Sequence, residues 1–207
     1  MPPVNSELRA KVLDYAHRNG GLYSPVPLPE FADIPHVHGV DRLEVVKPLV
    51  PAEAKTALDI GAHWGYWSHK LEDMGLEVTA VESAPEAGYF IKEIRDAAGK
   101  KFTILNQSVL DLPNPKFDLV LGLNIFHHFI KKEGLYKSFV AFLKRLDCQT
   151  MIFQAHSTSE GQMKGAYRNF TGPQFCDFIV ANSMLTDWEE AGVIGKRKVY
   201  KIWKRNT

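Results

Sequence analysis

Three polar side chains of this sequence each follow a short apolar run: Glu82, Asn124 and His156. Short apolar runs predict buried strands, and ligands of open α/β sheets lie outside the carboxyl ends of the strands. A carboxylate at such an end can accept hydrogen bonds from a ribose diol. His127 and His128 come just after Asn124, and a histidine can take a proton from a hydroxyl at neutral pH. The pattern predicts a ribose-binding crevice with histidines beside it.

A glycine turn follows the apolar run at 56–60, where the chain passes straight into Gly61 and Gly65. Glycine tolerates positive φ and lets a ligand lie against the backbone, so the turn is suited to a small polar or anionic group. A dinucleotide fingerprint would need glycines where His63 and Tyr66 stand, and a P-loop would need Gly-Lys-Ser/Thr after the turn. The turn therefore does not predict a nicotinamide, flavin or P-loop phosphate site.

Residues 59–65, with the sequence Asp-Ile-Gly-Ala-His-Trp-Gly, resemble the first motif, D-x-G-x-G-x-G, of the class I S-adenosylmethionine-dependent methyltransferases. His63 occupies the place of the middle glycine. In this resemblance Glu82 is the acid that holds the cofactor ribose. The segment 107–112 resembles the third motif, with Ser108 where an acid usually meets the adenine amino group. A serine hydroxyl still accepts a hydrogen bond but lacks the charge.

The run at 117–123 resembles the fourth strand of the same family. Asn124, which follows it, is the candidate for contact with the methionine moiety or with the methyl acceptor. The resemblance implies S-adenosylmethionine as the cofactor, with S-adenosylhomocysteine as its product. The cofactor-binding residues that it implies are Asp59, Gly61, Ala62, His63, Gly65, Glu82, Ser83, Ser108, Val109 and Asn124.

The elements that must position these residues alternate between apolar strands and amphipathic helices, as in a parallel α/β sheet. We expect a three-layer α/β/α Rossmann-like sandwich around a seven-stranded, mostly parallel sheet whose last strand is antiparallel. Trp64, Trp67, Leu71 and Met74 share one helical face after the glycine turn. The predicted strands are 56–60, 78–81, 102–105, 117–123, 150–153, 184–188 and 199–203. The last two are joined around Gly192 and Gly195.

Residues 1–55 are expected to form a helical and proline-rich cap on a core at 56–207, within one compact domain. Asn5 and Asp41 are each placed to cap a helix of this segment, and Thr171 is placed to cap a later one. Residues 157–171 are too long for a simple connection and are expected to face the substrate.

Composition narrows the classes of function. Lysine and arginine total 25 against 24 acids among 207 residues, so no overall basic charge attracts nucleic acid or an anionic membrane. Cys148 and Cys176 fit neither a disulfide framework nor a zinc spacing, and we expect buried, reduced thiols. The N-terminus lacks the apolar core of a signal peptide, and no apolar run approaches membrane-spanning length. We expect a cytoplasmic protein.

The predicted reaction is in-line transfer of a methyl group to a hydroxyl of a small molecule, a sugar or secondary metabolite. Asn124, His127 and His128 are the candidate catalytic residues, although one packed and one surface histidine is the plainer interpretation of the pair. No metal is expected, because the histidines lack helical ligand spacing. Two alternatives stay open: a tRNA- or RNA-modifying methyltransferase, resting on the basic residues at 196–205, and an inactive cofactor-binding module.

Overall fold

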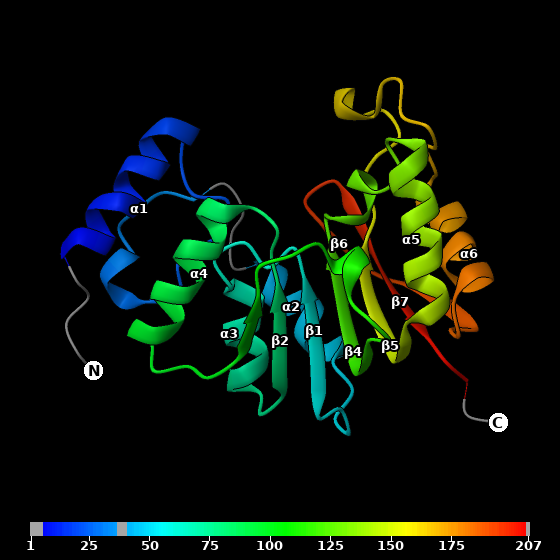
Figure 1. Cartoon of the computed structure of the whole chain (residues 1–207), viewed down its shortest axis with the longest axis horizontal. Helices are drawn as coiled ribbons and strands as arrows, with labels where there is room; N and C mark the ends of the chain where they lie inside the picture. The colour runs from blue at the N-terminus through cyan, green and yellow to red at the C-terminus, as the bar shows by residue number, and fades with distance from the viewer. Residues whose placement is uncertain (1–5, 37–40, 206–207) are drawn as a thin grey trace.

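The computed structural model describes residues 6–36 and 41–205. Its centre is a single seven-stranded sheet in the order β3-β2-β1-β4-β5-β7-β6 (Figure 1). The pairs among β1 to β5 are parallel, whereas β7 runs antiparallel to both β5 and β6. The predicted fold class is confirmed. The strands are β1 (Thr56–Ile60), β2 (Glu77–Val81), β3 (Thr103–Leu105), β4 (Lys116–Leu123), β5 (Asp147–Gln154), β6 (Asp187–Ile194) and β7 (Arg197–Trp203).

Helices cover both faces of the sheet because each strand buries side chains on alternate sides. Leu58 and Ile60 of β1 pack into one apolar cluster with α5 and α6, whereas Ala57 packs into another with α2 and α3. These two clusters form the core of the three-layer sandwich. The α-helices are α1 (Ser6–Asn19), α2 (Asp41–Val46), α3 (Tyr66–Asp73), α4 (Pro85–Ala97), α5 (Glu133–Arg145) and α6 (Gly172–Asn182).

A third apolar cluster joins the N-terminal residues to the core. Leu8 and Val12 of α1 pack with Phe90 and Ile94 of α4, and Trp64 is buried among them. Figure 1 shows α1 lying beside α4, on the opposite side of the β1 and β4 ends from α5 and α6. The N-terminal helix thus borders the carboxyl end of the sheet.

Two local predictions are wrong in ways that matter for the site. Trp64 does not lie on α3, which begins at Tyr66; its indole Nε1 donates instead to Ser24, 3.1 Å from the backbone oxygen and 3.0 Å from Oγ. The closing hairpin turns at Gly195 alone, since Gly192 lies inside β6 at a bulge. The predicted caps Asn5 and Asp41 fall outside the described side chains.

Thr171 caps α6 as predicted, in a capping box with Gln174. Both cysteines are buried and free. Across the helices of the described ranges, none is long and apolar enough to cross a bilayer.

Candidate cofactor and acceptor site

The two glycines of the turn after β1, Gly61 and Gly65, lie against different neighbouring side chains. Gly61 has φ +70°, and a Cβ there would come within 2.9 Å of Ile125 Cδ1. Gly65 has φ +83°, and a Cβ there would come equally close to Ile91 of α4. Both positions need the left-handed conformation that glycine adopts without strain. Gly65 therefore keeps α3 packed against α4, whereas Gly61 brings bare backbone against Ile125.

Gly61→Ala is expected to lower the free energy of unfolding by about 1 to 2 kcal/mol, because alanine is strained at positive φ and its methyl group would press on Ile125. Urea denaturation of the two proteins measures the difference. Gly134→Ala is the matched control, since a Cβ there meets no atom within 4 Å and its φ is ordinary. Equal midpoints for Gly61→Ala and the parent protein would contradict the expectation.

His63 adopts the left-handed conformation without being glycine, with φ 54°. Its ring lies 4.1 Å from the ring of Trp64 and 5.5 Å from that of Tyr23, between ring centroids. Burial lowers the pKa of His63, so its imidazole stays neutral. The resembling motif has a glycine at this position, where positive φ costs little. In this chain the aromatic contacts of His63 offset the strain of positive φ, which costs about 1 kcal/mol or more.

Glu82 stands at the end of β2 and is only 9% exposed. One carboxylate oxygen accepts from the His63 amide at 2.9 Å, and the other accepts from the Ala84 amide at 2.8 Å. Backbone hydrogen bonds fix the carboxylate against the glycine turn, while each oxygen keeps a lone pair for a further donor. The geometry suits a ribose diol.

Two narrow hollows meet at Gly61, and most of the predicted cofactor-binding residues line one of them. Gly65 and Asn124 are in neither lining. The first hollow is lined by Tyr23, Ser24, Arg42, Asp59, Ile60, Gly61, Ala62, His63, Tyr66, Trp67 and Leu123. The second is lined by Ile60, Gly61, Val81, Glu82, Ser83, Gln107, Ser108, Val109, Ile125 and Phe129.

The acid of the first hollow, Asp59, is 3% exposed and accepts a hydrogen bond from Ser68 Oγ at 2.7 Å. Burial raises the pKa of Asp59 to about 6, because a carboxylate loses hydration there; the Ser68 hydrogen bond opposes the shift. A cationic group that entered the hollow would favour the ionised form.

In the second hollow, Ser108 is the N-cap of the short 3-10 helix η3 (Val109–Asp111), and its Oγ accepts from the Leu110 amide at 3.2 Å. The hydroxyl thus has a structural task, and its proton is still available for donation. Val109 is buried and contributes an apolar wall beside it. The position where the family usually has an acid is here a capped turn.

Asn124, at the end of β4, joins the N-terminal segment to the hairpin. It has φ 59°, a conformation that asparagine tolerates better than most residues. Its Nδ2 donates to the Tyr23 hydroxyl at 3.1 Å, and its Oδ1 accepts from Arg197. Arg197 in turn donates from Nε and Nη2 to the two oxygens of Glu160, at 2.8 and 2.6 Å. This chain of contacts crosses the carboxyl end of the sheet.

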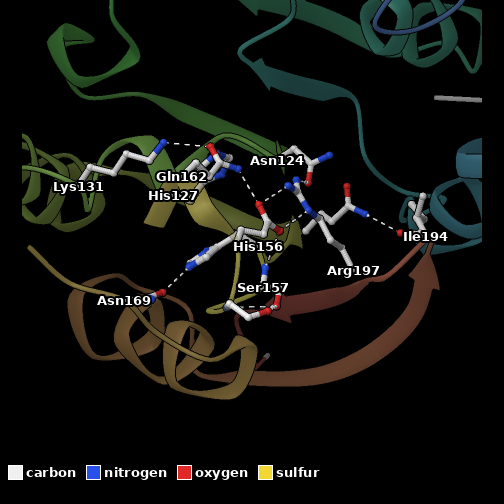
Figure 2. Close-up of polar contacts among 12 residues, drawn as sticks. Asn124, His127, Lys131, His156, Ser157, Gln162, Asn169, Ile194 and Arg197 are labelled. Atoms are coloured by element: carbon white, nitrogen blue, oxygen red, sulfur yellow. Dashed lines mark hydrogen bonds and ion pairs between the residues drawn. The ribbon is translucent and has the colours of Figure 1, made fainter. Parts of the chain in front are cut away.

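Two buried histidines lie on the α5 side of Asn124 (Figure 2). His127 Nε2 is 3.1 Å from Gln162 Oε1, and His156 Nε2 is 2.9 Å from Asn169 Oδ1. Because Gln162 Oε1 also accepts from Lys131, His127 must be the donor in its pair. The Nδ1 atoms of both rings are buried without a hydrogen-bond partner in the described structure. The Nδ1 atom of each ring is therefore a hydrogen-bond acceptor that is enclosed by the protein.

His127 and His128 differ in their fitness as bases. Burial, followed by the nearby His128 and Lys131, lowers the pKa of His127 to about 3. Partial burial also lowers the pKa of His128. His128 is the last residue of η4 (Phe126–His128) and is more exposed than His127. Their ring centroids are 4.1 Å apart. A base works best when its pKa lies near the working pH, which favours His128 over His127.

The histidines do not converge on a metal site. His63 lies on the α1 side, against Tyr15 and Tyr23, whereas His127, His128 and His156 lie together near η4. Within the described ranges, no group of three or more histidine, cysteine or acidic residues is arranged to hold a metal ion.

Sequence reasoning missed Arg42, Glu160 and Gln162 altogether, and it considered Arg197 only as one of the basic residues at 196–205. Glu160 binds Arg197 across 37 positions of sequence, so no local spacing indicated the pair. Burial raises the pKa of Glu160, but hydrogen bonds from Ser157, Gln162 and Arg197 outweigh it and bring the pKa to about 2. The length and polarity of the 157–171 loop were the only available signal.

Three of the six basic residues at 196–205 pair with acids. Arg197 pairs with Glu160, Lys198 pairs with Glu190 at 2.7 Å, and Arg205 pairs with Asp187. A surface that attracts nucleic acid needs unneutralised positive charge. The structure thus gives little support to an RNA-binding strand.

Comparison with known proteins agrees with the fold. A family model described as a methyltransferase domain matches residues 58–145. No curated protein sequence matches the chain significantly. The bifunctional kinase-methyltransferase WbdD is similar in structure, with a TM-score of 0.76 and 15% identity over 95% of this chain and 46% of that one. The present chain thus spans about half the length of WbdD.

Two further structures are similar over most of their own length. Magnesium protoporphyrin IX methyltransferase (ChlM) from Synechocystis PCC 6803, with bound S-adenosylmethionine, has a TM-score of 0.59 and 15% identity over 78% of this chain and 77% of that one. N-methyltransferase NodS from Bradyrhizobium japonicum WM9 has a TM-score of 0.60 and 12% identity over 80% and 97%. At sequence identities this low, the structural similarity shows the fold alone.

The fold, the glycine turn and the domain match at residues 58–145 are together similar to those of the class I, Rossmann-like S-adenosylmethionine-dependent methyltransferases. S-adenosylmethionine is the cofactor of that superfamily.

Proposed function

We propose that the protein transfers the methyl group of S-adenosylmethionine to a hydroxyl of a small molecule, such as a sugar or secondary metabolite. The observation that carries the proposal is the pair of hollows that meet at Gly61, one lined by Asp59 and the other by Glu82. S-adenosylmethionine has an amino-acid end and an adenosine end joined at sulfur. Two hollows that share Ile60 and Gly61 in their linings match that shape.

The residues present fit the adenosine end. Glu82 would accept hydrogen bonds from the ribose diol, while its two backbone contacts prevent the carboxylate from turning away. Ser83, Ser108 and Val109 line the same hollow and would border the nucleoside. Selectivity for adenine would depend on apolar contact and on hydroxyl or backbone groups, since no acid stands at position 108.

The acceptor would lie beside Asn124, His127 and His156, where β4 and β5 end. The Nδ1 atoms of the two histidines are enclosed acceptors, and a hydroxyl that reached them as side chains moved aside would donate a hydrogen bond. The lowered pKa values of His127 and His156 keep both rings neutral at pH 7, so each Nδ1 keeps its lone pair as a hydrogen-bond acceptor. These features support a hydroxylated acceptor.

When bound, the cofactor would supply an electrophilic methyl group to the acceptor oxygen, whose proton would have to be removed. His128 would take that proton, because its pKa is the less depressed of the adjacent pair. Asn124 would hold the acceptor in line, a contribution that dominates methyl transfer. Tyr23 of the N-terminal segment and the loop 157–171 would exclude water.

His128→Ala is expected to lower turnover about tenfold and to leave cofactor affinity unchanged, because it removes the base but no cofactor contact. His127→Ala should also lower turnover, since it removes an acceptor contact. Initial rates of S-adenosylhomocysteine formation and calorimetric affinity measure the two quantities. His17→Ala, an exposed histidine on α1, is the matched control. Full rates in both His127 and His128 variants would place proton removal elsewhere.

The function itself is tested with methyl-labelled S-adenosylmethionine and a panel of small polyols, phenols, amines and tRNA. Transfer to a hydroxyl acceptor supports the proposal, and transfer to an amine alone contradicts its acceptor class. Binding to tRNA that weakens steeply with salt, together with transfer to it, would establish the RNA alternative. Cofactor binding without transfer to any acceptor would indicate the inactive module.

A further inference from the structure

Arg197 lies where the closing hairpin reaches the edge at which the parallel strands end. β7 runs antiparallel to β5, so its first residue, Arg197, lies just beyond the last residue of β5. The hairpin turn before it is tight, because Ile194 of β6 pairs directly with Arg197. Asn124 follows β4 at the same edge, 73 positions earlier in the sequence. The antiparallel strand therefore places a cation beside a residue of the candidate acceptor site.

All three nitrogens of the Arg197 guanidinium donate hydrogen bonds. Nε and Nη2 donate to the two carboxylate oxygens of Glu160, at 2.8 and 2.6 Å, and Nη1 donates to Asn124 Oδ1 (Figure 2). Two parallel bonds to one carboxylate fix the plane of the guanidinium. The side chains of Arg197 and Glu160 are 25% and 21% exposed, so solvent screens this ion pair only in part. The third nitrogen thus has a fixed direction, toward Asn124.

The contact with Arg197 decides which way the side-chain amide of Asn124 faces. The Tyr23 hydroxyl, 3.1 Å from Nδ2, belongs to a group that both donates and accepts, so it would suit either end of the amide. A guanidinium only donates, so the amide atom that it contacts must be the oxygen. Asn124 is also buried at a positive φ of 59°, a conformation that persists where surrounding contacts fix it. Without Arg197, the amide could turn over.

We propose that Arg197 is a positioning residue for methyl transfer: it orients the Asn124 amide toward the methyl acceptor, and Glu160 holds it in place. The inference rests on the proposed function, in which Asn124 holds the acceptor in line. The amide nitrogen has two N–H groups, so it can donate to Tyr23 and to an acceptor oxygen together. A reaction that depends on alignment loses about 100-fold when a group moves by about 1 Å. Neither Arg197 nor Glu160 lines the two hollows, so the loss should fall on turnover and leave cofactor affinity unchanged.

The test is a set of mutant cycles on the full chain. The kcat is measured with the polyol or phenol that is methylated fastest in the acceptor panel, and the affinity for S-adenosylhomocysteine is measured by calorimetry. Arg197→Gln should lower kcat about 30-fold and Glu160→Gln about tenfold, with affinity changed by less than about twofold. Arg197→Lys keeps the charge but cannot make all three contacts, so its loss should be intermediate. Lys198→Gln is the matched control, because Lys198 is the next residue of β7 and pairs with Glu190.

The cycles separate a positioning role from a purely structural one. Combining Arg197→Gln with Glu160→Gln should cost no more than Arg197→Gln alone, and Arg197→Gln should change kcat by less than about twofold in an Asn124→Ala background.

Three results would overturn the role of Arg197 while leaving the proposed function intact. They are a parental kcat in Arg197→Gln, an undiminished loss in the Asn124→Ala background, and a loss of S-adenosylhomocysteine affinity as large as the loss of kcat. If Arg197→Gln does not fold, Arg197→Lys and Glu160→Gln in the two backgrounds decide. A parent protein that transfers methyl groups to no hydroxyl acceptor would overturn the proposed function and this inference together.

Discussion

Glu82→Ala is expected to weaken S-adenosylmethionine binding by about 2 to 3 kcal/mol, which is a loss of about 30- to 150-fold. Two effects add. The variant removes the carboxylate that would accept from the ribose diol, and it releases the His63 and Ala84 amides that the carboxylate holds. Isothermal titration calorimetry of both proteins measures the change.

Two control variants separate these effects. Glu82→Gln keeps an acceptor oxygen but removes the charge, so its loss should be intermediate. Glu86→Ala removes an exposed acid four positions later, on α4, and should leave affinity unchanged. Unchanged affinity in Glu82→Ala would exclude Glu82 from the cofactor site.

The free energy of unfolding is expected to fall by about 3 kcal/mol between pH 7 and pH 5. Burial lowers the pKa of His127 to about 3 and that of His69 to about 4. Between pH 7 and pH 5 the histidines of the unfolded chain, which have the ordinary pKa, become protonated, whereas His127 and His69 of the folded chain stay neutral. A histidine with a depressed folded pKa contributes stability that is present above its unfolded pKa and is lost as the pH falls toward the folded one.

The size of this effect follows from the individual shifts. Each of these two histidines lowers the free energy of unfolding at pH 5 by about 2 kcal/mol relative to pH 7. Asp59 acts in the opposite direction, because its pKa is raised to about 6 and its protonation favours the folded state by about 1 kcal/mol. The lowered pKa values of His63, His128 and His156 act in the same direction as those of His127 and His69.

Urea denaturation at the two pH values measures the loss. In His127→Gln the difference between pH 7 and pH 5 should shrink by about 2 kcal/mol, whatever the stability of the variant at pH 7. His17→Gln, on the exposed surface of α1, is the matched control. Superimposable curves at the two pH values would show that the buried histidines titrate alike in both states.

Most of the fold was predictable because its signals are local. Apolar runs end at glycines or polar residues, and the Thr171–Gln174 capping box lies within four positions. Trp64 shows the limit of such reasoning. Its spacing from Trp67 and Leu71 is helical, but contacts with Ser24 and α1 hold it outside the helix. Long-range packing decided its place, and sequence periodicity does not contain that information.

The site divides in the same way. Asp59, Gly61 and Glu82 were predictable because strand ends and turns are read from neighbouring residues, and the structure brings them together at the two hollows. Arg42 and the Glu160–Arg197 pair were not, because their partners stand far away in sequence. Positive φ at His63 also has no sequence signal except its place in the glycine motif. The roles of all these residues in binding and turnover stay predictions.

The position of the Ile125 side chain against Gly61 affects which parts of a bound ligand contribute to its affinity. Its side chain covers Gly61, so the middle of the site is already filled by hydrocarbon in the free protein. A molecule that crosses there exchanges one apolar contact for another and displaces little ordered water, which leaves a small net gain at its centre. Selectivity would then reside at the two extremities, and fragments of the molecule that carry only one of them should bind weakly.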